Sequence, residues 1–269
     1  MVDYKFKENY TFNDLVEIVK ILRAPGGCPW DAEQTHESIR QDFLEETYEV
    51  LEAIDTKNPV LMQEELGDVL LQVVFHADLA KAEGTFDIDA VADGICKKLI
   101  IRHPHVFADV SVSSTGEVLK NWDDIKRQTK KQPTQTAAMQ AIPATFPALM
   151  KAQKVQGKAR KAGFDWRDED GAFEKIAEEA AEVKEALANG NKAEIEDELG
   201  DLLFSCVNVA RFCDCDAESA LEKATKKFMK RFAVTEALAA ERGVDIKEAS
   251  LETLDALWDE AKLRTKQTD

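Results

Sequence analysis

Residues 198–210 read ELGDLLFSCVNVA, and residues 65–75 read ELGDVLLQVVF. Each stretch opens with the same four residues, which place two acids three positions apart, and continues with a long apolar run. A helix that is apolar around its whole circumference belongs in the interior of a protein. The two stretches therefore predict two buried helices, each with a pair of carboxylates where the apolar run begins.

The two stretches belong to an internal duplication. Four acids recur at an offset of 133 residues, a Lys-x-x-x-Arg pair recurs at 129, and a Trp-x-x-x-Lys pair recurs at 136. The acids are Glu46, Glu49, Glu65 and Asp68 in the first copy and Glu179, Glu182, Glu198 and Asp201 in the second. Acids, bases and tryptophan in one repeated order indicate a duplicated unit of about 110–130 residues. We expect the repeats to span 12–131 and 144–266, joined by a polar linker at 132–143.

The expected fold class is all-α. With 44% hydrophobic residues the chain can bury a core, and no alternating strand pattern of useful length interrupts the helical periodicity. The expected helices are 12–23, 36–56, 59–83, 87–102 and 116–131, then 144–162, 171–188, 192–213, 217–242 and 251–266. Because a two-helix hairpin cannot cover a helix that is apolar on all sides, we expect two tandem helical-bundle repeats, each covered by its twin or by a second chain. A dimer is the expected assembly.

The charge balance excludes some classes of function. Lys and Arg total 35 against 52 Asp and Glu, a formal net charge of −17. Such a surface repels polyanions, so we expect no nucleic acid polymer as a partner. No apolar run approaches the roughly 18–20 residues of a membrane helix, and no secretory pattern or Cys-x-x-Cys pair is found. We therefore expect a cytoplasmic protein that does not bind membranes.

The acids of the second copy predict a metal site. Glu179 and Glu182 share one helix face, as do Glu198 and Asp201 on the next helix, and the break at 187–191 predicts an antiparallel hairpin. Four carboxylates in a partly buried cleft repel one another unless a cation neutralises them. Because every ligand is an oxygen, Mg²⁺ is expected, with Mn²⁺ as a possible substitute.

Two alternatives accompany the metal interpretation. A solvated acidic face explains one Glu-x-x-Glu pair in so acidic a chain, but it explains less well acids at the mouth of a buried helix. A carboxylate-bridged di-iron bundle needs Glu-x-x-His on two helices. All four histidines lie in the first copy, so a di-iron site in the second copy is disfavoured.

Basic and aromatic residues follow the acids in the second copy. Lys227 and Arg231 lie four apart on one helix face, and Lys262 lies four after Trp258. Together with Mg²⁺ these cations can hold a triphosphate, and Trp258 can stack on a base. The alternative is that the bases pair with neighbouring glutamates and that Trp258 is a core residue.

Asn208 distinguishes the second copy from the first. It lies seven residues after Asp201 on the same helix face, where the first copy has Phe75. A buried amide without a partner is costly. We therefore expect Asn208 to face a ligand cleft that Phe75 would fill, unless a neighbouring backbone group satisfies the amide. This difference predicts that the second copy carries the activity.

The acidic pairs resemble those of the all-α nucleoside triphosphate pyrophosphohydrolases. Three further motifs are similar to those of two-repeat MazG proteins: Gly27-Cys28-Pro29-Trp30-Asp31, Arg102-His103-Pro104-His105-Val106-Phe107 and Gly163-Phe164-Asp165-Trp166. The resemblance extends over about residues 14–266. It implies hydrolysis of a nucleoside triphosphate to the monophosphate and pyrophosphate, Mg²⁺ dependence, broad base tolerance, a homodimer and a role in clearing the nucleotide pool.

The resemblance also implies roles for individual residues. The metal ligands would be Glu179, Glu182, Glu198 and Asp201, and the substrate contacts would be Lys227, Arg231, Trp258 and Lys262. The C-terminal copy would be the catalytic one. Glu178, next to the metal pair, is our hypothesis for the group that orients or deprotonates the attacking water. A different class of function stays open, namely a regulator that binds a nucleotide without turnover, or a helical scaffold.

Overall fold

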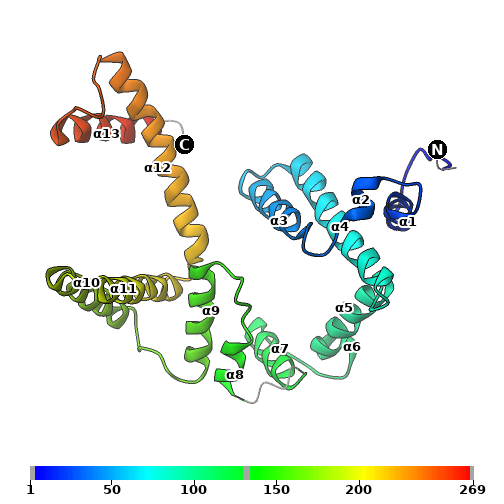
Figure 1. The fold of residues 1–269 in the computed structure, drawn as a ribbon. Coiled ribbons are helices and arrows are strands. Elements are labelled where there is room, and N and C mark those ends of the chain that lie inside the picture. The colour runs from blue at the N-terminus through cyan, green and yellow to red at the C-terminus, as the bar shows by residue number, and fades with distance from the viewer. Residues whose placement is uncertain (1–3, 130–133, 267–269) are drawn as a thin grey trace. The chain divides into compact units, whose positions relative to one another are not determined.

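The computed structural model describes residues 4–129 and 134–266, and all regular structure in these ranges is α-helical (Figure 1). The expected all-α class is confirmed. The chain forms two units, residues 1–126 (unit 1) and residues 127–269 (unit 2). Within the described ranges, every helix falls short of the length or the apolar character that a membrane span requires.

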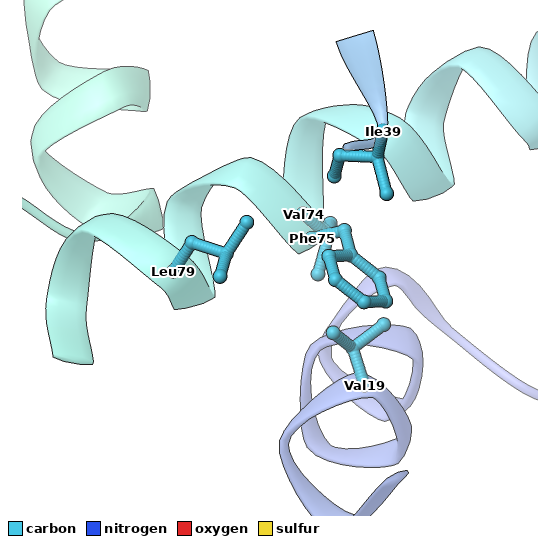
Figure 2. Packing of buried hydrophobic residues seen from close by; sticks show 5 residues of the cluster. All are labelled: Val19, Ile39, Val74, Phe75 and Leu79. Atoms are coloured by element: carbon cyan, nitrogen blue, oxygen red, sulfur yellow. The ribbon is translucent and has the colours of Figure 1, made fainter. Parts of the chain in front are cut away.

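Unit 1 is organised around the hairpin of α3 and α4. Its helices are α1 (Phe12–Arg23), α2 (Pro29–Glu33), α3 (Arg40–Asp55), α4 (Pro59–Ala82), α5 (Ile88–Arg102), α6 (Pro104–Phe107) and α7 (Thr115–Thr129), the last of which crosses into unit 2. Helix α1 packs against α4. Their contact forms the core, in which Val19 of α1 meets Val74, Phe75 and Leu79 of α4 and Ile39 beside α3 (Figure 2).

Unit 2 is organised around the hairpin of α10 and α11. Its helices are α8 (Gln135–Gln140), α9 (Ala148–Lys161), α10 (Asp170–Asn189), α11 (Lys192–Phe212), α12 (Ala217–Glu241) and α13 (Leu251–Lys266). Helix α9 packs on α11 and bonds the start of α12, where the Gln153 amide accepts from the Ala217 backbone N–H. Helices α12 and α13 form a separate small core from Leu238 and Leu257. Helix α13 lies at the end of α12 that is remote from α10 and α11 (Figure 1).

Side-chain caps set the helix starts that the sequence predicts. The Asn58 side-chain oxygen accepts from two backbone N–H groups at the start of α4, and Pro59 occupies the first helical position. Asp87 and Asp216 cap α5 and α12 in the same way. These caps satisfy N–H groups that a helix leaves unpaired at its first turn, which is why the predicted and observed starts agree to within one residue.

The observed helix starts differ from the predicted ones where a local turn or cap replaces the first helical residues. Helix α3 begins at Arg40 rather than at 36, because Thr35 and Ser38 exchange side-chain to backbone hydrogen bonds in a turn. Helix α8 occupies part of the expected linker, with the Thr134 hydroxyl as its cap, while positions 132 and 133 lie outside the described residues. Helix α9 begins after Pro147, later than expected. The expected repeat boundaries stay a prediction.

The two acidic apolar helices are each buried only in part. Val74 of α4 and Val207 of α11, at matching positions, are buried. Leu66 and Leu70 of α4 are 51% and 39% exposed, and the matching Leu199 and Leu203 of α11 are 44% and 57% exposed. The predicted burial around the whole circumference is therefore wrong for both helices in a single chain, because the helices packed against them cover only part of each.

Candidate functional site

A tight turn brings the acids of the second copy together. Helix α10 ends at Gly190, whose backbone has a φ of +71°, in the left-handed region that favours glycine. Asn191 then caps α11 by accepting from the Ala193 backbone N–H. Two residues thus reverse the chain, so the end of α10 meets the start of α11 as an antiparallel pair, as the sequence predicts.

The hairpin gathers four further carboxylates around Glu179. One oxygen each of Glu179, Glu198 and Asp201 lie within 4.8 Å of one another. A second such group consists of Glu178, Glu179 and Glu182. The structure therefore brings together all four acids predicted to be metal ligands, and it adds Glu178 to them.

Glu179 is the most enclosed member of this cluster. It is 3% exposed, and its Oε2 atom is buried without a hydrogen-bond partner. The hydrogen bond with Glu179, followed by burial, raises the pKa of Glu182 above its usual value, and burial raises the pKa of Glu198. The cluster is thus short of positive charge, and a hard cation with oxygen preference fits this donor set.

Lys175 is the one cation in contact with the cluster, within the part of the chain that is described. Its Nζ atom lies 2.8 Å from Glu178 Oε1 and 2.5 Å from Glu179 Oε1, and these two bonds raise the pKa of the lysine. Lys175 was not among the site residues predicted from the sequence. The available signal was its position one turn before Glu179 on the same helix face, where the first copy has Asp42.

The predicted substrate contacts on α12 and α13 do not reach the acids within one chain. Among the described residues, none of Lys227, Arg231 and Lys262 forms an ion pair with the acids of α10 and α11. Lys262 pairs instead with Asp259 at 2.8 Å, and Trp258 packs on Phe228 with ring centroids 5.1 Å apart. Arg231 Nε is buried without a partner. Their roles toward substrate stay predictions.

Asn208 borders a cavity of about 390 Å³ between α9, α11 and the loop at 163–166. It is buried, and its Oδ1 atom accepts from Arg211 Nε at 2.8 Å. The neighbour that satisfies this oxygen is therefore a side chain on the same helix rather than a backbone group. In unit 1, Phe75 lies in the core, with its ring against Val19 (Figure 2). Asn208 thus borders open space, whereas Phe75 packs in a core, and the role of Asn208 toward a ligand stays a prediction.

The first copy keeps an acidic cluster of its own. One oxygen each of Glu46, Glu49 and Glu65 lie within 4.8 Å of one another. Glu65 is 6% exposed, and its burial, together with a hydrogen bond to Glu49, raises its pKa to about 7. The acids alone therefore do not distinguish the two copies.

Comparison with known proteins identifies the family of this chain. Residues 34–107 and 168–233 match the MazG nucleotide pyrophosphohydrolase domain. The chain is 49% identical over 251 residues to the nucleoside triphosphate pyrophosphohydrolase/pyrophosphatase MazG of Thermotoga maritima, covering 93% of this chain and 95% of that protein. The chain belongs to the MazG family. The resemblance found in the motifs is thereby confirmed.

Two further MazG relatives differ in length. The nucleoside triphosphate pyrophosphohydrolase of Escherichia coli K12 is 44% identical over 253 residues, which are 92% of this chain and 95% of that protein. The uncharacterized protein YabN of Bacillus subtilis is 46% identical over 254 residues, which are 94% of this chain but 52% of that protein. The region similar to this chain therefore makes up most of the Escherichia protein and about half of the Bacillus protein.

The matched MazG segments contain the acids of both copies together with Lys227 and Arg231. They leave out α13, with Trp258 and Lys262, and they leave out α9 and the loop at 163–166. The acidic hairpin is thus the part that both copies share with the MazG domain. The walls of the cavity lie mostly outside the matched segments.

Proposed function

We propose that this chain hydrolyses nucleoside triphosphates to nucleoside monophosphates and pyrophosphate, with Mg²⁺ held by Glu179, Glu182, Glu198 and Asp201. The observation that carries the proposal is the buried Glu179 oxygen, which has no partner at the centre of five carboxylates. The printed names of the Thermotoga and Escherichia relatives support the reaction class. Mn²⁺, another hard divalent cation, is the expected substitute.

Bound Mg²⁺ would supply positive charge to the phosphates and make a nearby water more acidic. The protein's own side chains would orient the attacking water and contact the phosphates. Glu178 is exposed and is held by Lys175, so its free oxygen can accept a hydrogen bond from the attacking water and orient it. The Lys175 ammonium, on its flexible stem beside the cluster, can exchange a carboxylate for a phosphate oxygen as the substrate arrives.

We propose that the active form is a homodimer. The exposed apolar residues of α11 support it, and so do Leu221, Phe228 and Met229 of α12, which are 55%, 56% and 65% exposed. A second chain would cover these faces and would be a source of the cations and the tryptophan that one chain does not bring to its own acids. Light scattering is expected to give twice the 30.1 kDa chain mass at micromolar concentration. A strict monomer with full activity would contradict this arrangement.

Substrate contacts by Lys227, Arg231, Trp258 and Lys262 belong to the same proposal. Cations aimed at phosphates do not read the base, which supports broad base tolerance and a role in clearing the nucleotide pool. Such a substrate pool is consistent with a cytoplasmic location.

The test is pyrophosphate release from a mixed set of ribo- and deoxyribonucleoside triphosphates, with Mg²⁺ and with a chelator. We expect release that depends on Mg²⁺ and is lost in Glu179→Gln. Binding of nucleotides without release of pyrophosphate would instead favour a sensing regulator, and neither binding nor release would favour a scaffold.

A further inference from the structure

Two exposed thiols flank the turn that connects α11 to α12. Cys213 follows the last residue of α11, Asp214 and Cys215 come next, and Asp216 caps α12. Both cysteines are exposed and free. The Cys215 Sγ atom donates to the Cys213 carbonyl oxygen at 3.4 Å, so this thiol lies against the backbone of the other cysteine. Because oxidation of a thiol depends on its access to solvent, the two residues are a candidate pair for oxidation.

The backbone of the turn sets the distance between the two cysteines. Asp214 has a φ of +56°, and a residue with a side chain adopts the left-handed helical conformation at that angle. This conformation mirrors the right-handed helix, so it places the α-carbons on either side of it about 5.4 Å apart. Disulfides join residues whose α-carbons are roughly 4.4–6.8 Å apart. Cys213 and Cys215 are therefore within reach of a disulfide bond.

The bond can form only if the turn rearranges. Side chains two residues apart on a helical turn do not face each other, whereas a disulfide needs its two Cβ atoms roughly 3.5–4.5 Å apart. The backbone change falls on Asp214, because it is the residue between the two cysteines. Its left-handed conformation is strained for a residue with a side chain, so leaving that conformation relieves strain.

The matching turn of the first copy has neither thiols nor strain. Glu83, Gly84 and Thr85 follow α4 there, and Gly84 has a left-handed φ of +73°, which glycine adopts readily. Both turns close with the same bond, from the backbone N–H of the third residue to the carbonyl oxygen five residues back, at 3.0 Å in the first copy and 2.9 Å in the second. This turn can therefore be built without cysteine, and the two thiols around Asp214 are specific to unit 2.

The turn directs the helix that carries the predicted phosphate contacts. Helix α12 leads away from α10 and α11 at this point (Figure 1). Gln153 of α9 holds the turn, because its Nε2 donates to the Cys215 carbonyl oxygen at 2.7 Å and its Oε1 accepts from the Ala217 backbone N–H at 2.9 Å. A rearranged turn moves the Cys215 carbonyl away from Gln153. Helix α12 then changes direction, and Lys227 and Arg231 move with it.

We propose that Cys213 and Cys215 are an oxidative modification site, at which a reversible disulfide redirects α12 and lowers turnover. Hydrogen peroxide is the oxidant. One thiol sulfur takes an oxygen atom from peroxide and becomes a sulfenic acid, and one water molecule leaves. The other thiol sulfur attacks the sulfenic sulfur, so the S–S bond forms and a second water molecule leaves. The two thiols lose two protons and two electrons in total, and a dithiol reductant returns them.

Peptide mass analysis of the full chain tests the bond. Reduced protein is treated with hydrogen peroxide, alkylated and digested with trypsin, which releases both cysteines in the peptide 212–223. We expect this peptide to lose two hydrogen atoms and to resist alkylation until dithiothreitol is added. Cys206, which is exposed on α11 with no cysteine two residues away, is the matched control and should stay open to alkylation. Oxygen added to Cys213 or Cys215 without loss of hydrogen, or a disulfide between two chains, would overturn the pairing.

Pyrophosphate release with Mg²⁺ tests the effect on turnover, which rests on the proposed function, whereas the bond itself does not. Peroxide is expected to lower kcat/KM of the wild type by at least about tenfold, because the cations of α12 are misplaced, and dithiothreitol should restore it. Cys213→Ser and Cys215→Ser should keep full activity and no longer respond to peroxide, whereas Cys206→Ser should respond as the wild type does.

Two further outcomes separate this inference from the proposed function. If the disulfide forms and kcat/KM is unchanged, the control of α12 by the turn is wrong while the proposed function stands. If the reduced enzyme releases no pyrophosphate, the proposed function and the effect on turnover fall together, and the mass measurement still decides whether the bond forms.

Discussion

The two acidic hairpins of this chain share a motif and differ in what surrounds it. In unit 1, α3 and α4 carry clustered acids next to Asp42, and Phe75 fills the neighbouring space. In unit 2, α10 and α11 carry the same cluster next to Lys175, and Asn208 opens onto a cavity. The comparison teaches that the same acidic motif can stand in two different surroundings. If the copies differ in activity, we expect the neighbouring residues, rather than the acids, to cause the difference.

The largest expected effect separates the two clusters directly. Glu179→Gln should lower Mg²⁺-dependent pyrophosphate release by at least about 100-fold, because it removes the central carboxylate of the metal site. The matched Glu46→Gln should stay within about twofold of wild type. Initial rates, with circular dichroism to check helical content, measure both. Comparable losses in the two variants would mean that both copies are catalytic.

Arg231 is expected to have the next largest effect. Arg231→Ala should lower kcat/KM by about 10–1000-fold for every nucleoside triphosphate, since a charged phosphate contact is lost. Arg102, which corresponds to Arg231 in the first copy, serves as the control, and Arg102→Ala should change little. Steady-state kinetics with four different bases give the result. A loss confined to one base would indicate that Arg231 reads the base instead of the phosphates.

Exchanging the residue one turn before the acids between the two copies tests the comparison further. Lys175→Asp, which introduces the first-copy residue, should lower kcat/KM by about 10–100-fold because it adds negative charge where phosphates must approach. Lys175→Arg should recover part of the loss, and the reverse change in unit 1, Asp42→Lys, should leave activity unaltered. Full activity in Lys175→Asp would show that the lysine only neutralises the acids when no metal is bound.

The smallest expected effect concerns stability in the first copy. The pKa of Glu65 lies near 7 in the folded state, above the ordinary 4.5, so the folded protein binds an extra proton between these values. Stability therefore falls as pH rises through this window. In metal-free protein, Glu65→Gln should raise the unfolding temperature at pH 8 and have little effect at pH 4. An equal shift at both pH values would contradict the raised pKa.

The sequence predicts local structure well because local chemistry sets it. Caps such as Asn58 and Asp216 act within one turn, and the Gly190-Asn191 turn follows from two adjacent residues. The grouping of the four acids then follows from helix periodicity and a short connection, which is why the candidate metal ligands were predictable.

Features that depend on distant parts of the chain were not predictable. The cavity needs Gln156 of α9 beside Asn208 of α11, and nothing in the spacing of one helix reveals this neighbour. The exposure of Leu203 depends on which helices cover α11. The direction of α12, which carries Arg231 away from the hairpin, depends on the packing of α9 at its start.

The arginine–aspartate pairs of the two units have a consequence for how the copies can change. In unit 2 the arginine, Arg211, belongs to α11 and the acid, Asp165, to the loop between α9 and α10, whereas in unit 1 the acid, Asp78, belongs to α4 and the arginine, Arg23, to α1. Replacing α11 by α4 through recombination would set Asp78 against Asp165, and the opposite replacement would set Arg211 against Arg23. In either hybrid, two side chains of like charge would face each other at a half-buried position. Exchanging single helices between the two copies is therefore expected to destabilise either hybrid, whereas exchanging whole repeats would keep each arginine with its own acid.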